Sequence, residues 1–247
     1  MDAQRLEEEA SEFAVELMLR LAEILPTGAL GFTCEAAPLG DGSARMTVVS
    51  EHKNGIPLTI EGEPRLQLEV NFALMLSPNS RRATVLKSSF LVRPHGQGRP
   101  LFTLDYVRDA HSNTPSAHYN FHLDHDLIEN ELLSTGAARR GKSYRRDVAA
   151  GRKPRVADLH FPVGGHRFRP CLEDVIEMLW IEFGIDVKTT TAGAAIKSGR
   201  EAWRTMQVRA AVADDPENAA AELRELGYIV SPPSAPRASR FERIHAI

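Results

Sequence analysis

The sequence predicts an α+β protein in which an antiparallel β-meander sheet of roughly five to seven strands is packed by helices. Two observations carry this prediction. Between residues 30 and 123 the apolar side chains recur at every second position, which is typical of strands with one buried face. Before residue 26 and after residue 170 they recur at every third and fourth position, which is typical of amphipathic helices.

The first helix is predicted over residues 3–25. Its apolar residues form a stripe along one side, which indicates that it packs on the sheet. The spacing rests on Leu6, Ala10, Phe13, Leu17, Leu21 and Leu25. Pro26 and Gly28 end the run, because neither residue continues a helix readily.

The clearest strand is predicted over residues 66–76. Its even-numbered positions, from Leu66 to Leu76, are apolar, whereas Gln67, Glu69 and Asn71 are polar. The other predicted strands are 30–36, 44–50, 84–92, 101–107 and 117–123. Short turns such as LGDGS and PHGQGRP separate them, and turns of this length favour antiparallel neighbours.

The remaining chain is predicted to be mostly helical. Pro170 begins a helix that Gly184 ends, with Glu173 and Asp174 in its first turn, and two more helices are expected at 192–212 and 215–227. A short helix is expected at 126–135. The predicted organisation is a core domain at 1–186, a helical C-terminal appendage at 187–230 and a disordered, proline- and serine-rich tail at 231–247.

The composition favours a cytoplasmic protein without a membrane segment. The chain has 247 residues, a formal net charge of −3 and 43% hydrophobic residues. Its two cysteines, Cys34 and Cys171, lie far apart and form no paired motif, so we expect a reducing compartment. The acidic N-terminus does not have the pattern of a signal peptide, and no apolar run approaches the length of a bilayer span.

Histidines are concentrated in the middle of the chain. Six of the nine lie between 111 and 166: His111, His118, His122, His125, His160 and His166. In the strand 117–123, alternation places Ala117 and Phe121 on a core face. The opposite face then carries a polar row of His118, Asn120, His122 and Asp124.

A second polar row is predicted from residues 157–169, which we interpret as a β-hairpin turning on Gly164–Gly165. In that pairing the buried residues are Phe161, Val163 and Phe168. The side chains that project are His160, Arg167 and Arg169, with His166 set apart at the turn. We expect this row and the row on 117–123 to converge into one site.

The first chemical interpretation is acid–base cleavage of a phosphodiester. His122 and His160 form the acid–base pair, because imidazoles titrate near neutral pH, and His118 and Asp124 are further catalytic candidates. Asn120, Arg167 and Arg169 are predicted to bind the substrate, with the arginines neutralising phosphate charge. This chemistry requires no cofactor.

Two other interpretations remain open. A divalent metal could be held by His122, Asp124 and His160, because His122 and Asp124 lie only about 7 Å apart in a strand. His118 and His122 lie about 13 Å apart and are too distant to share an ion. In the last interpretation there is no functional site, and these residues form a solvated sheet face with flanking arginines. Cys171 at a helix start is interpreted as a packing residue rather than as a nucleophile.

The segment 137–155 is strongly basic and lacks an apolar pattern, so we expect a loop or a frayed helix. Asp147 is the only acid among Arg139, Arg140, Lys142, Arg145, Arg146, Arg152, Lys153 and Arg155. We predict that Lys142, Arg145 and Arg146 contact nucleic-acid phosphates and that Tyr144 stacks on a base. A solvated loop, or docking on the Glu7–Glu9 run of a second copy in a homodimer, is the alternative.

Together these features predict a nucleic-acid-directed protein, with RNA favoured over DNA, that acts as a ribonuclease-like phosphodiesterase. The alternative is a non-catalytic interaction or regulatory protein whose His/Arg face binds a protein partner or a structural metal. A His-bearing polar row followed by a proline-started helix resembles the layout of small prokaryotic toxin-type ribonucleases, although no family motif matches residue by residue. That resemblance implies RNA cleavage.

Overall fold

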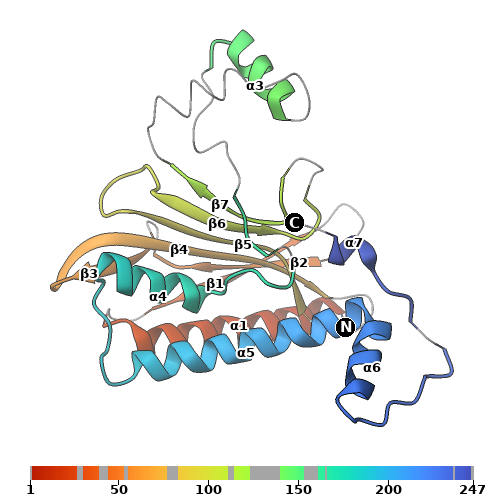
Figure 1. Cartoon of the computed structure of the whole chain (residues 1–247). Coiled ribbons are helices and arrows are strands. Elements are labelled where there is room, and N and C mark those ends of the chain that lie inside the picture. Colours follow the sequence, from red (N-terminus) through yellow and green to blue (C-terminus); the bar gives the residue numbers. More distant parts are fainter. Residues whose placement is uncertain are drawn as a thin grey trace.

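The chain forms one antiparallel sheet backed on one face by helices (Figure 1). The computed structural model describes residues 2–26, 30–38, 44–52, 55–76, 83–110, 114–122, 140–152, 161–164, 166–235 and 237–245. Within these ranges the sheet has eight strands in the order β1-β2-β4-β5-β6-β7-β8, and β3 pairs with β4 beside this path. The predicted α+β class with an antiparallel meander is confirmed, and the eighth strand has only two residues.

The strand bounds follow the alternation of the sequence closely. They are β1 Phe32–Pro38, β2 Ala44–Ser50, β3 Ile56–Ile60, β4 Glu63–Leu76, β5 Ala83–Pro94, β6 Phe102–Val107, β7 Ala117–Phe121 and β8 Phe161–Pro162. The long strand β4 is central: Val70 pairs with Phe90 of β5, and both side chains are buried. Because paired residues share a face, the apolar positions of successive strands form one continuous layer.

Three of the helices cover that apolar layer: α1 Asp2–Ile24, α4 Leu172–Phe183 and α5 Ala192–Asp214. The other helices are α3 Arg140–Ala149, α6 Pro216–Glu225 and α7 Phe241–Ile244. α1 lies against the sheet with α5 alongside it (Figure 1). Leu6 and Leu21 of α1 are 1% exposed, as its apolar stripe predicts. No helix in the described ranges is both long and apolar enough to span a bilayer.

α4 ends at Gly184 as predicted, but it begins at Leu172, two residues after the predicted start at Pro170. The backbone N–H of Cys171 donates to Asp174 Oδ2 at 3.0 Å, which caps the first turn. Gly184 ends the helix with φ of 70°, a left-handed conformation that favours glycine.

The start of α5 contributes to the same core as the sheet. Ala192, Ala195 and Ile196 are buried within the main apolar cluster. The predicted division at residue 186 stays a prediction, but the chain just beyond it packs into the core domain. The helix predicted at 126–135 lies outside the described residues.

The predicted hairpin at 157–169 is wrong. Phe161 and Pro162 pair with β7 rather than with residues 166–169, which form no strand. The chain turns tightly instead, with the N–H of Phe168 donating to the Gly164 carbonyl at 3.0 Å. Gly164 has φ of 68°, and a Cβ there would lie 2.5 Å from the Phe168 backbone, so only glycine fits this turn.

This turn reverses the faces that strand alternation predicts. Phe168 is 84% exposed and Phe161 is 44% exposed, although both were predicted to be buried. Arg169, predicted to project, is only 7% exposed, and His166 is 5% exposed. Side chains alternate about a strand axis, and in a turn that rule does not hold.

The C-terminal segment returns to the end of α5. Ser239 Oγ donates to Asp215 Oδ1 at 2.9 Å, and the N–H of Arg240 donates to the Asp214 carbonyl at 2.7 Å. Part of the segment predicted to be disordered therefore follows a defined path in residues 237–245. Phe241 and Ile244 are about half exposed, so polar contacts rather than apolar packing hold this segment.

Two isoleucines of α4 provide a test of this packing. Ile176 is fully buried in the core, whereas Ile181 on the same helix is 70% exposed. We expect Ile176→Ala to lower the free energy of unfolding by about 2–5 kcal/mol, because it removes buried contacts and leaves a cavity. Ile181→Ala should change it by no more than about 0.5 kcal/mol. Equal losses in urea unfolding would contradict this assignment of the buried face.

Candidate functional site

A polar cluster lies on the face of the sheet opposite the helices. The Asp105 carboxylate on β6 accepts hydrogen bonds from Ser89 Oγ at 2.6 Å, Thr103 Oγ1 at 2.9 Å and Asn120 Nδ2 at 3.1 Å. Ser89 pairs with Asp105, and Thr103 pairs with Asn120, so strand register brings these side chains onto one face. Three donors to one carboxylate form a fixed network across β5, β6 and β7.

Two residues of the predicted row lie in this region. Asn120 belongs to the cluster, and His118 lies opposite Asp105 on the same face, as alternation predicts. Both are more enclosed than a solvated row would be, with exposures of 9% and 4%. His118 Nδ1 lies 2.8 Å from the carbonyl oxygen of Pro115, which orients the ring toward its own loop.

Of the other three catalytic candidates, the structure describes only His122. His122 follows the end of β7 and is half-buried, and its backbone N–H donates to the Leu101 carbonyl at 2.8 Å. Asp124 and His160 lie outside the described residues, so the proposed acid–base pair and the proposed metal ligands stay predictions. β8 does pair with β7, so Phe161 and Pro162 lie beside the strand that carries His118 and Asn120, whereas Arg167 and Arg169 are not part of the sheet.

No metal centre is apparent in the part of the chain that the structure describes. There, no group of three or more histidine, cysteine, aspartate or glutamate side chains is arranged to hold an ion. Of the predicted ligands, only His122 belongs to this part.

The basic segment contains the helix α3, which stands clear of the sheet (Figure 1). Arg145 and Arg146 are exposed. The acid of this helix, Asp147, is paired with Arg152, and this hydrogen bond holds the pKa of the Asp147 carboxyl below its usual range. Lys142 and Tyr144 belong to the helix, but their side chains are outside the description. α3 therefore presents net positive charge to solvent.

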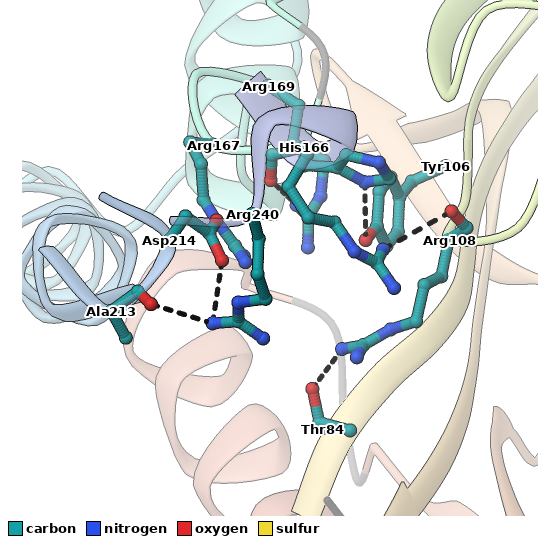
Figure 2. A network of polar contacts seen from close by, with 10 residues as sticks. Thr84, Tyr106, Arg108, His166, Arg167, Arg169, Ala213, Asp214 and Arg240 are labelled. Atoms are coloured by element: carbon teal, nitrogen blue, oxygen red, sulfur yellow. Dashed lines mark hydrogen bonds and ion pairs between the residues drawn. The ribbon is translucent and has the colours of Figure 1, made fainter. Parts of the chain in front are cut away.

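Arg167 and Arg169 lie elsewhere, on the helix-covered side of the sheet, in a cluster around His166 (Figure 2). Arg169 is buried with its guanidinium carbon 3.6 Å from the ring centroid of Tyr106 and 4.8 Å from that of Trp203. It also donates to the His166 carbonyl. Burial lowers the pKa of Arg169 to about 10, since few groups here replace the water around its charge.

Arg167 is held by a buried carboxylate at the end of α5. Asp214 is 2% exposed, and its oxygens lie 2.6 Å from Arg167 Nε and 2.7 Å from Arg240 Nη2. Arg240 also donates to the Ala213 carbonyl at 3.1 Å. The structure thus brings Arg167 and Arg169 together with each other, but not onto the face that carries His118 and Asn120.

His166 is the titratable centre of this cluster. Tyr106 Oη lies 3.1 Å from His166 Nδ1, a distance at which the hydroxyl can donate to a neutral imidazole. Burial first, and then the charges of Arg243, Arg167, Arg169 and Arg108, together lower the pKa of His166 to about 4. His166 is therefore uncharged at neutral pH.

Sequence reasoning missed most of this cluster. Tyr106 lies in β6 and Arg108 directly follows it, whereas Asp214 ends a helix more than a hundred residues later. Arg240 and Arg243 belong to the C-terminal segment. One signal was available: Arg237, Arg240 and Arg243 recur at intervals of three in a segment otherwise rich in proline and serine. That spacing places cations on one side of a helical turn.

A cavity of about 710 Å³ lies between α1, α5 and strands β4 and β5. Its walls combine aromatic rings with carboxylates, including Phe13, Phe72, Glu12, Glu16 and Glu201. Cys171 also lines it, but burial raises the pKa of this thiol well above its ordinary value. The thiol is therefore a packing group, as interpreted from the sequence, and not an activated nucleophile.

The lowered pKa of His166 predicts a specific loss of stability in acid. Between its ordinary value of 6.5 and its folded value of about 4, the unfolded chain binds the proton more readily than the folded one. The free energy of unfolding should therefore fall as pH drops through this window, by about 3 kcal/mol from this group. Urea unfolding of His166→Asn should show a correspondingly shallower dependence on pH. The matched control His95→Asn changes an exposed histidine and should keep the wild-type slope.

Comparison with protein-family models finds no match, and comparisons with curated proteins and with solved structures find none either. The function is therefore argued from the residues and geometry of this chain.

Proposed function

We propose that the protein binds nucleic acid, RNA in preference to DNA, through the basic helix α3. The observation that carries the proposal is the exposure of Arg145 and Arg146 on a helix that stands clear of the sheet (Figure 1). A chain with a formal net charge of −3 concentrates positive charge there, and such local asymmetry attracts a phosphate backbone. Asp147 does not cancel it, because its charge is already paired with Arg152.

The proposal includes cleavage of the bound strand. α3 lies between β7 and β8 in the sequence, so RNA held by the helix is close along the chain to the segments that carry His122 and His160. In this mechanism one imidazole removes the proton of a ribose 2′-hydroxyl and the other protonates the leaving oxygen. The 2′-hydroxyl as internal nucleophile is the reason to favour RNA, since DNA lacks it.

A non-catalytic interaction protein is the second candidate. It is favoured by the burial of His118, Asn120 and Arg169, whose polar groups already contact the protein itself. Polar side chains that are already bonded within the protein are better suited to stabilising the fold than to catalysis.

Charge-removing variants of α3 test the binding proposal. Arg145→Ala/Arg146→Ala should weaken binding to a single-stranded RNA oligomer and flatten the dependence of log Kd on log salt by up to about 1.4, roughly 0.7 for each lost phosphate contact. The matched control Arg204→Ala/Arg209→Ala removes two exposed arginines from α5 and should leave both quantities unchanged. Affinity that is insensitive to salt in the wild-type protein would rule out phosphate binding by α3.

Incubation with end-labelled RNA, with and without EDTA, tests cleavage. Metal-free chemistry at two imidazoles predicts products in both conditions, and a metal centre predicts products only without the chelator. His122→Ala and His160→Ala should each abolish cleavage, while RNA binding is retained. Unchanged cleavage by either variant would overturn the assignment, and absence of any cleavage with intact binding would favour the second candidate.

A further inference from the structure

Positive charge accumulates around His166 beyond what the neighbouring acids neutralise. Within the described ranges two carboxylates, Asp214 and Asp109, face five guanidinium groups: Arg108, Arg167, Arg169, Arg240 and Arg243. The five come from three separate parts of the chain: Arg108 directly follows β6, Arg167 and Arg169 lie in the turn before α4, and Arg240 and Arg243 belong to the C-terminal helix α7 and its N-cap. The fold therefore gathers like charges that repel one another.

The carboxylates are distributed unevenly over these arginines. Asp214 forms ion pairs with both Arg167 and Arg240. Asp109 Oδ1 lies 3.6 Å from Arg243 Nη2, but the Asp109 side chain is 78% exposed. Arg108 and Arg169 form no ion pair with a carboxylate among the described residues, although the charge of the neighbouring Asp109 also acts on Arg108. Arg108 donates to the Val85 carbonyl at 3.2 Å and to Thr84 Oγ1, which are neutral acceptors.

The electrostatic state of the cluster shows that this charge is not compensated. Arg169 is only 7% exposed, and its Nε has no hydrogen-bond partner in the described structure. The pKa of Arg108 is lowered, first by burial and then by Arg243 and Arg167. A buried charge without a partner is costly, so a fold that collects several of them favours an anion that restores the balance.

The cluster is open to solvent on one side. The side chains of Arg240, Arg243 and Arg167 keep exposures of 36%, 21% and 19%. Figure 2 shows Arg108, Arg169 and Arg240 extending from different elements toward a common region. An anion can therefore approach from the side of the C-terminal segment and meet guanidinium donors from the strands and from that segment together.

We propose that the arginine cluster around His166 is a binding site for a phosphate-class anion. Arg108 and Arg240 are the direct donors, because each retains guanidinium N–H groups beyond those used in its protein contacts. The other three arginines are not direct donors, but their charges raise the positive potential at the site; they are Arg167, Arg169 and Arg243. Planar guanidinium forks match tetrahedral oxyanions, and their hydrogen bonds to a charged acceptor are about twice as strong as neutral ones. The site is separate from α3, so it does not depend on the proposed RNA binding.

A titration of the wild-type protein by NMR tests the site without any substitution. His166 Nδ1 and Nε2 report the local potential, and His166→Asn identifies their resonances. Sulfate keeps its double charge down to about pH 3, so a titration from pH 3 to 7 covers the transition of His166, and saturating sulfate should raise its pKa by about one unit or more relative to chloride at equal ionic strength. A saturable rise supports the site. A pKa that is the same in both salts overturns it.

Calorimetry with inorganic phosphate then locates the donors. Arg108→Gln and Arg240→Gln should each weaken phosphate binding by about tenfold or more, as expected for the loss of a hydrogen bond to a charged group. Arg204→Gln on the exposed face of α5 is the matched control and should bind like wild type. Equal weakening in the control would overturn the location. If a donor variant fails to fold, the wild-type titration still decides.

A second ligand distinguishes the source of the phosphate. A 5′-nucleoside monophosphate that binds no better than inorganic phosphate indicates a site for the free anion, and one that binds at least tenfold more tightly indicates a nucleotide or strand end. Arg145→Ala/Arg146→Ala should leave phosphate affinity unchanged, so failure of this site and failure of RNA binding at α3 are separately visible. Loss of phosphate binding in that variant would overturn the claim that the two sites are independent.

Discussion

One face of the sheet must be kept from water, and the rest of the molecule is arranged around that constraint. From β4 to β7, each strand places its apolar side chains on the same side, and antiparallel register aligns them into one layer. α1, α4 and α5 supply the complementary apolar stripes. Burying such a layer is the dominant favourable term in folding, roughly 25 cal/mol for each Å² of apolar surface. The same pleat fixes where polar groups lie, because every residue between two core positions must point to the opposite face.

Polar interactions then position the elements that the apolar layer leaves undefined. The clearest example is Asp214, a buried carboxylate at the end of α5 that holds Arg167 from the turn before α4 and Arg240 from the C-terminal segment. A carboxylate this deeply buried is stable only while its cationic partners are present. On the other face, Asp105 plays a comparable role by joining β5, β6 and β7 through Ser89, Thr103 and Asn120.

The protein therefore carries two positively charged regions of different character despite its net negative charge. On α3 the arginines are exposed, which suits a long, flexible polyanion whose contacts are individually weak. Around His166 the arginines are enclosed and held by neighbouring groups, which suits a small anion bound at fixed distances. Regions that differ in burial are expected to differ in salt dependence as well, since exposed charges are screened far more strongly than buried ones.

By itself, the sequence determined the fold class, the limits of most strands, the end of α4 at Gly184 and its start to within two residues, because these depend on local periodicity and on the φ preferences of single residues. It also determined that His118 and Asn120 share a face, which is a property of any strand. Only the tertiary structure decided that Arg169 is buried against Tyr106 and Trp203, and that Arg240 returns to Asp214. Alternation stops where the chain turns at Gly164, and pairings between residues far apart in the chain depend on how elements pack, which no local pattern encodes.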